Sequence, residues 1–169
     1  MKGRESGLVC DFARGSFMMI GGGMKTFKDA PADWERLLKD FFGIDRIGTW
    51  YGMSEIMGQA PRCGAGYYHF LPYTIPFVLD EDAVPLPREG VQTGRMALFD
   101  LIAETYWGGF ISGDRVTMYW DNACTCGWNG PRVEDSITRF SELEGGDDKI
   151  TCAGTAKAYN DFMDYVGVI

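Results

Sequence analysis

A strand, a glycine turn, a helix and a second strand follow one another early in the chain, and this order most constrains the fold. The apolar run 17–20 meets three glycines at residues 21–23, as expected of a short buried strand that ends in a tight turn. An apolar stripe at helical spacing follows, with Pro31 suited to the first turn and Gly43 to the position past the end. A second strand is expected at residues 44–51. Strands joined by a helix form a βαβ unit, which predicts a piece of parallel sheet.

The middle of the chain has a different pattern, in which short β segments are separated by glycine and proline. Residues 67–79, 95–102 and 114–120 are expected to form strands, and the prolines interrupt the first of these segments. Residues 155–169 return to an apolar stripe at helical spacing. We therefore predict a mixed α/β fold: a βαβ piece of a parallel sheet, then a β-rich, barrel-like subdomain and a terminal helix. The predicted parts of this single domain are residues 1–60, 61–154 and 155–169.

Charge and cysteine content argue against several classes of protein. The 169 residues carry a formal net charge of −8 without a basic cluster, so we expect no nucleic-acid partner. No apolar run approaches the roughly 20 residues that cross a bilayer, and residues 1–10 lack the apolar core of a signal peptide. We therefore expect a cytoplasmic protein with no membrane partner. Five cysteines, an odd number, disfavour a disulfide framework and leave free thiols or metal ligands.

The pentapeptide Tyr51-Gly52-Met53-Ser54-Glu55 follows the second expected strand and carries groups suited to a nucleotide. Gly52 lets the backbone approach a ligand closely, and Ser54 offers a hydroxyl to a phosphate oxygen. Glu55 offers a carboxylate to Mg²⁺, a hard cation that prefers oxygen ligands. Tyr51 offers a flat face to a purine ring. The alternative is that these residues form an ordinary surface loop.

This pentapeptide has the form Tyr-Gly-x-Ser/Thr-Glu, a hallmark of the adenylate-forming superfamily of acyl- and aryl-CoA ligases. Other segments resemble motifs of that superfamily and stand in the same order; they are residues 21–25, 89–95, 112–114, 124–127 and 147–150. The first resembles a Gly-Gly-Gly-Trp-Lys stretch of acyl-protein synthetases, with Met24 in place of the Trp. The fourth resembles the Cys-x-Cys-Gly of phenylacetate–CoA ligases. The chain therefore resembles the C-terminal part of the main domain of such a ligase, from about residue 17 to 154.

The resemblance implies a site for ATP or AMP. In the superfamily the glycine-rich turn and the aromatic residue of the pentapeptide frame the adenine. This role falls to Gly22, Gly23 and Tyr51 here, with Gly52 beside them. The Asp of a Thr-Gly-Asp motif accepts hydrogen bonds from the ribose hydroxyls, which implies Asp114.

The resemblance also implies the catalytic groups. Ser54 would contact the α-phosphate, Glu55 would bind magnesium, and Arg139 would contact the nucleotide. A surface ion pair is the alternative for Arg139. The implied reaction activates a carboxylic acid with ATP and passes the acyl group from acyl-AMP to CoA or a protein thiol. All of this requires Tyr51, Ser54, Glu55 and Asp114 to converge on one hollow.

A second constellation has the composition of a structural zinc site. Cys63, the single histidine His69, and the pair Cys124 and Cys126 offer three thiolates and one imidazole, a closed tetrahedral set. This order of ligands, a Cys, a His and a Cys-x-Cys pair after the pentapeptide, also resembles that of phenylacetate–CoA ligases. The zinc would fasten the insert to the barrel-like region and take no part in catalysis. The alternative is a set of unliganded thiols beside one hydrogen-bonded histidine.

The chain contains no Ser/Thr/Gly-rich phosphate loop and no recognisable catalytic-lysine motif, both of which such ligases carry. We therefore expect part of a ligase that needs a complementary N-terminal half or a partner subunit. A non-catalytic nucleotide- or partner-binding module with a structural zinc is the alternative. A zinc-stabilised interaction protein without a nucleotide role is the third possibility.

Overall fold

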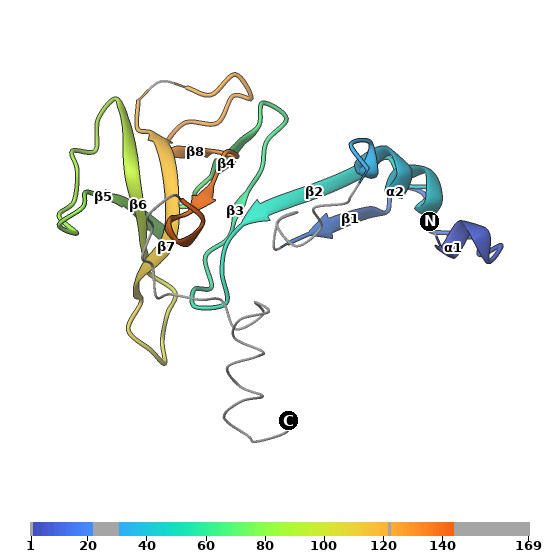
Figure 1. Ribbon diagram of the computed structural model, residues 1–169, viewed down its shortest axis with the longest axis horizontal. Helices are drawn as coiled ribbons and strands as arrows, with labels where there is room; N and C mark the ends of the chain where they lie inside the picture. Colours follow the sequence, from blue (N-terminus) through green and yellow to red (C-terminus); the bar gives the residue numbers. More distant parts are fainter. Residues whose placement is uncertain (1, 22–30, 122, 144–169) are drawn as a thin grey trace.

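The computed structural model describes residues 2–21, 31–121 and 123–143, and these residues form a mixed, mostly β structure. A four-residue helix, α1 (Lys2–Glu5), begins the described chain. A three-stranded sheet with one longer helix lies to one side of a six-stranded sheet, as Figure 1 shows. The predicted terminal helix over residues 155–169 lies outside the described residues.

The small sheet contains the parallel pair of strands, and the longer helix connects these two strands in the sequence. β1 (Phe17–Ile20) pairs in parallel with β2 (Arg46–Tyr51), and β3 (Ala60–Pro61) pairs antiparallel with β2. Between β1 and β2 in sequence lies α2 (Trp34–Phe42), which ends at Gly43 in a left-handed conformation with φ 64°. The predicted strand at residues 17–20 and the predicted helix end at Gly43 are therefore confirmed.

The large sheet is antiparallel throughout. Its strands are β4 (Tyr67–His69), β5 (Thr74–Leu79), β6 (Val91–Asp100), β7 (Gly109–Tyr119), β8 (Arg132–Glu134) and β9 (Thr138–Arg139). The order is β4-β8-β7-β6-β5, and β9 also pairs with β7. Among the described strands no pairing joins β4 to β5, so this part of the chain is an open sheet and the barrel-like closure that we predicted is not seen.

The main core joins the two sheets. Met96, Met118 and Val133 from neighbouring strands of the large sheet are each 0% exposed, and Tyr51 and Ile56 pack against the same cluster. Because Tyr51 ends β2 and Ile56 belongs to the segment that leads to β3, burial holds this segment against the large sheet. Within the described residues, no helix is long and apolar enough to cross a membrane.

Candidate functional site

A cleft of about 1030 Å³ lies where the small sheet meets the large one. The pentapeptide of residues 51–55 lines it from the small sheet, and residues 112–114 of β7 line it from the large sheet together with Arg139 of β9. The structure thus brings Tyr51, Ser54, Glu55 and Asp114 to one hollow, as the sequence predicted. Gly21 also lines the cleft, whereas Gly22 and Gly23 lie outside the described residues.

The buried face of β7 changes from apolar to polar where it reaches the cleft. Alternate residues of a strand share a face, so Ser112 and Asp114 continue the face of Val116 and Met118. All four side chains are buried, with Asp114 at 6% exposure. A carboxylate at this depth needs partners, and the neighbouring elements provide them.

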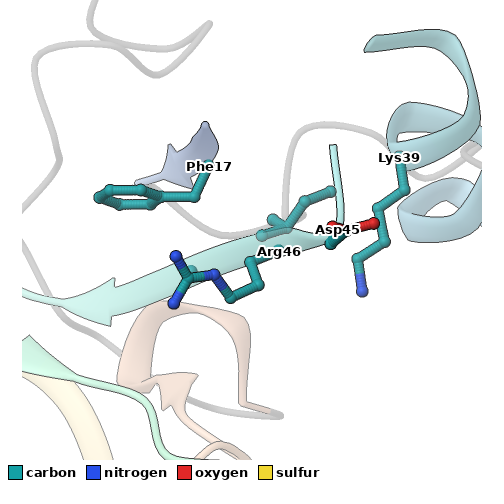
Figure 2. Close-up of a pocket in the computed structure, with 6 residues that line it drawn as sticks. Phe17, Lys39, Asp45 and Arg46 are labelled. Atoms are coloured by element: carbon teal, nitrogen blue, oxygen red, sulfur yellow. The ribbon is translucent and has the colours of Figure 1, made fainter. Parts of the chain in front are cut away.

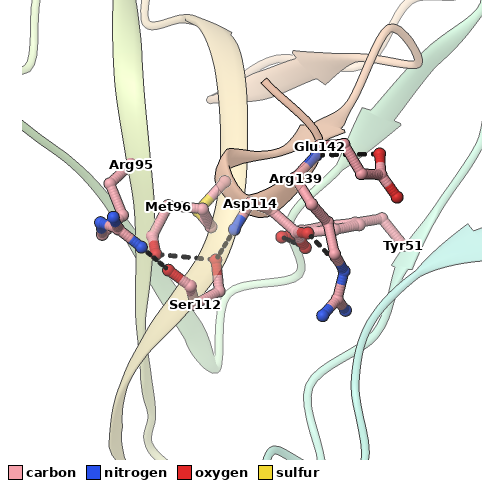
Figure 3. Close-up of polar contacts among 7 residues, drawn as sticks. All are labelled: Tyr51, Arg95, Met96, Ser112, Asp114, Arg139 and Glu142. Atoms are coloured by element: carbon pink, nitrogen blue, oxygen red, sulfur yellow. Dashed lines mark hydrogen bonds and ion pairs between the residues drawn. The ribbon is translucent and has the colours of Figure 1, made fainter. Parts of the chain in front are cut away.

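Both carboxylate oxygens of Asp114 are engaged (Figure 3). The Tyr51 hydroxyl donates to Oδ2 at 3.0 Å, and Nε of Arg139 lies 3.4 Å from Oδ1. Arg139 is directly opposite Asp114 in the β7–β9 register, which explains the ion pair. Burial and the neighbouring Asp114 charge raise the pKa of Tyr51 well above its ordinary value, so the phenol stays protonated and donates. The ion pair expected as the alternative for Arg139 is therefore present, and it lies at the cleft.

Tyr51 is more enclosed than a stacking platform for a purine would be. Its side chain is only 8% exposed, and its ring packs against Tyr68 and Phe70 with centroids 6.0 and 6.4 Å away. In this structure Tyr51 therefore serves mainly to hold Asp114, although the residue also lines the cleft.

Ser112 fixes the backbone from which Asp114 projects, a role that the sequence interpretation missed. A register shift between Arg95 and Ala97 interrupts the β6–β7 ladder near Met96. The Ser112 hydroxyl donates to the Met96 carbonyl at 2.9 Å and accepts the Asp114 amide at 3.1 Å (Figure 3). It thus satisfies two backbone groups next to an irregularity of the sheet. The period-two spacing of Ser112 and Asp114 was the signal that could have linked them.

Ser54 and Glu55 are exposed at the rim of the cleft, and the Ser54 hydroxyl donates to the Glu55 carboxylate at 3.3 Å. Both side chains are exposed, whereas Asp114 is buried and lines the inner part of the same cleft. A hydroxyl and a carboxylate in this position can contact a phosphate and a hard divalent cation. The cleft therefore offers hydrogen-bond acceptors at depth and oxygen ligands at its rim.

The four predicted zinc ligands come together in the structure and could hold a metal ion. One ligand atom from each of Cys63, His69, Cys124 and Cys126 lies within 4.8 Å of all the others. The Cys63 and Cys124 sulfurs are 3.9 Å apart, and the Cys126 sulfur is 3.4 Å from Nε2 of His69. Tetrahedral zinc, with Zn–S near 2.3 Å and Zn–N near 2.0–2.1 Å, would set these edges at about 3.8 and 3.5 Å. The donor set and its spacing fit zinc.

The two cysteine loops have the same local construction. The Gly66 amide donates to the Cys63 carbonyl at 3.1 Å, and the Gly127 amide donates to the Cys124 carbonyl at 2.8 Å. Both glycines have positive φ, 87° and 90°, which a residue with a side chain rarely adopts. Each loop therefore turns back tightly after its first cysteine and presents a sulfur to the common centre.

The surroundings of His69 favour a neutral imidazole. His69 is 2% exposed, and burial followed by the nearby Arg132 charge lowers the pKa of the ring. A metal requires the neutral form of this ligand. Arg132 lies opposite His69 in the β4–β8 register and places positive charge close to this group of residues.

A second, smaller pocket of about 370 Å³ lies away from these groups. Phe17, Lys39, Asp45 and Arg46 line it, and the Arg46 guanidinium lies 5.8 Å from the centre of the Phe17 ring (Figure 2). It contains none of the predicted site residues.

No protein-family model matches this chain, and no curated protein matches it. The function proposed for the chain therefore rests on the geometry of the cleft and on the resemblance of its motifs.

Proposed function

We propose that the chain is the nucleotide-binding part of an acyl-adenylating ligase, which activates a carboxylic acid with ATP and passes the acyl group to a thiol or a protein. The single observation that carries this proposal is the convergence of Ser54, Glu55, Asp114 and Arg139 on one cleft. The resemblance to adenylate-forming ligases calls for such a meeting of residues that are far apart in sequence, and this supports the proposal.

Each group has a task that fits its position. Asp114, which is buried, accepts hydrogen bonds from a ribose diol that reaches the inner part of the cleft. Arg139, which is partly exposed beside it, donates to the nucleotide. Ser54 and Glu55 at the rim hold the phosphate end, and Mg²⁺ bound at Glu55 would supply charge neutralisation to the phosphates. Adenylation depends mainly on alignment and on offsetting charge, which these residues are suited to provide.

The small sheet supports a role for a partner. Buried parallel sheets are covered on both faces, yet Phe17 of β1 is 59% exposed and Trp50 of β2 is 40% exposed. No residue of α2, which is entirely described, is buried. We infer that β1, α2 and β2 are the βαβ end of a larger parallel sheet. A complementary N-terminal half or partner subunit would supply the rest, including the phosphate loop and the acid pocket.

The metal centre is proposed as a structural zinc in a cytoplasmic protein. Its four ligands close the coordination shell, so it leaves no position for a reacting water. It joins the loop after β3 to the loop after β7 and so supports one side of the large sheet. Zinc would contribute to stability and not to catalysis.

A non-catalytic nucleotide- or partner-binding module with this zinc is the second candidate. The observation that favours it is that no lysine, the catalytic side chain of such ligases, is among the described residues that line the cleft. Such a module would bind nucleotide through Asp114 without turnover.

Reconstitution tests the proposal and separates the two candidates. The chain is mixed with the N-terminal half of an acyl-protein synthetase or a phenylacetate–CoA ligase, and carboxylate-dependent pyrophosphate exchange is measured. The enzyme proposal expects exchange that the substitution Glu55→Gln reduces at least tenfold, with Glu81→Gln on a distant turn as the matched control. Nucleotide binding without exchange favours the module, and neither binding nor exchange rejects both.

A further inference from the structure

A buried carboxylate outside the predicted site lies directly behind the cleft loop. Asp100, the last residue of β6, is 2% exposed and belongs to none of the motifs considered above. An ionised carboxylate at this depth is unfavourable unless several donors surround it. The donors that surround Asp100 therefore indicate what the residue does.

Four donors converge on Asp100. Its Oδ2 accepts the backbone amides of Met57 at 2.6 Å and Gly58 at 3.1 Å, and the Tyr106 hydroxyl lies 3.4 Å away. Its Oδ1 accepts the Ile102 amide at 3.1 Å. Burial raises the pKa of Asp100, but the hydrogen bonds from Ile102, Met57 and Gly58 outweigh it, and the net pKa lies below the ordinary value. The group is therefore a charged acceptor that attracts these amides.

Two of these amides belong to the loop that forms the rim of the cleft. The segment between β2 and β3 begins with the cleft-lining residues Met53, Ser54 and Glu55 and continues through Met57 and Gly58. Inside this segment the structure gives one backbone hydrogen bond, from the Ile56 amide to the Met53 carbonyl, and it is long at 3.4 Å. The loop thus has little internal bonding to fix its shape.

We propose that Asp100 is the positioning residue of the cleft: its carboxylate holds the Met57 and Gly58 amides and thereby sets where Ser54 and Glu55 meet a ligand. Asp100 does not touch the ligand itself. It links the end of β6 in the large sheet to a loop of the small sheet. The part of this inference that concerns nucleotide rests on the proposed function, whereas the part that concerns the loop does not.

The test compares Asp100→Asn with the wild-type chain. Asparagine has nearly the same shape but carries no charge, and it replaces one acceptor oxygen by a donor. Nuclear magnetic resonance should show the Met57 and Gly58 amide protons moving upfield, and hydrogen exchange of these two amides should accelerate about tenfold or more. Affinity for MgATP, measured by calorimetry, should fall by a similar factor.

A core substitution separates positioning from general destabilisation. Leu79→Ala removes buried volume from β5 at a residue that does not line the cleft and lies outside the core cluster of Tyr51 and Ile56. It should lower global stability yet leave the Met57 and Gly58 amide shifts and the MgATP affinity unchanged. If Asp100→Asn does not fold, a measurement on the wild-type chain still tests whether Asp100 holds the loop. A scalar coupling across the hydrogen bond, between the Met57 amide nitrogen and the Asp100 carboxyl carbon, is expected, and its absence counts against the proposal.

The possible outcomes distinguish the two proposals. Unchanged Met57 and Gly58 amides in Asp100→Asn overturn the positioning role. Altered amides with unchanged MgATP affinity also overturn it, because the loop would then not set the ligand site. A wild-type chain that binds no MgATP rejects the proposed nucleotide function. In that case the amide shifts and exchange rates alone decide whether Asp100 holds the loop.

Discussion

Ser112→Ala is the substitution that most directly tests how the strand β7 presents Asp114. The change removes one hydroxyl from a side chain that is 2% exposed. Two backbone groups lose a partner, the Met96 carbonyl and the Asp114 amide, which now lie 2.9 and 3.1 Å from the hydroxyl oxygen.

The expected loss follows from these two contacts. A buried polar group left without a partner costs about 1–3 kcal/mol, and the irregular β6–β7 register gives neither group an obvious replacement. Partial relaxation reduces the sum, so we expect the free energy of unfolding to fall by about 2–4 kcal/mol. The backbone at Asp114 should also move, which should weaken MgATP binding.

Urea unfolding, followed by far-ultraviolet circular dichroism, measures the change. The matched control is Ser136→Ala, which removes an exposed hydroxyl that, among the described residues, donates a hydrogen bond to the Glu134 carboxylate. If Ser112→Ala unfolds within about 0.5 kcal/mol of the wild type, the role assigned to this hydroxyl is wrong.

Three further predictions concern the metal, an acid and the Tyr51 hydroxyl. The purified chain should contain about one zinc, and chelation should lower the melting temperature by about 10 °C or more, whereas Cys10→Ser should not reduce the zinc content. The pKa of Asp100 is lower in the folded than in the unfolded chain, so its ionised form stabilises the fold above about pH 4, and this stabilisation is lost as the pH falls through the folded pKa. In Asp100→Asn the free energy of unfolding should therefore depend less on pH in this acid range. Tyr51→Phe should cost about 1–2 kcal/mol in urea unfolding, because Asp114 loses a buried donor, and an unchanged stability would contradict that contact.

Local sequence patterns predicted where an element forms more accurately than they predicted how long it is. The strand at residues 17–20 and the end of α2 at Gly43 follow from an apolar run and a cap, which are local signals. The strands expected at residues 95–102 and 114–120 are longer in the structure, as β6 (Val91–Asp100) and β7 (Gly109–Tyr119). Glycines within and before these strands disguised them, because glycine is typical of turns.

The candidate sites also contain residues that the sequence indicated and contacts that it did not. The motifs indicated Glu55, Asp114 and the metal ligands, since the residue types themselves carry the chemistry. No sequence signal showed that Asp100 would meet the amides of Met57 and Gly58, because those contacts depend on how two sheets pack. The open form of the large sheet could not be predicted from the sequence either, because strand order depends on long-range pairing.

Calorimetric titration of the chain with MgATP tests the central claim most directly. The account predicts saturable binding that Asp114→Asn weakens at least tenfold, while Asp82→Asn, an equal change of charge on the exposed turn after β5, leaves the affinity unchanged. Absence of binding up to millimolar nucleotide, or equal affinity in Asp114→Asn and the wild type, would contradict a nucleotide cleft built on Asp114.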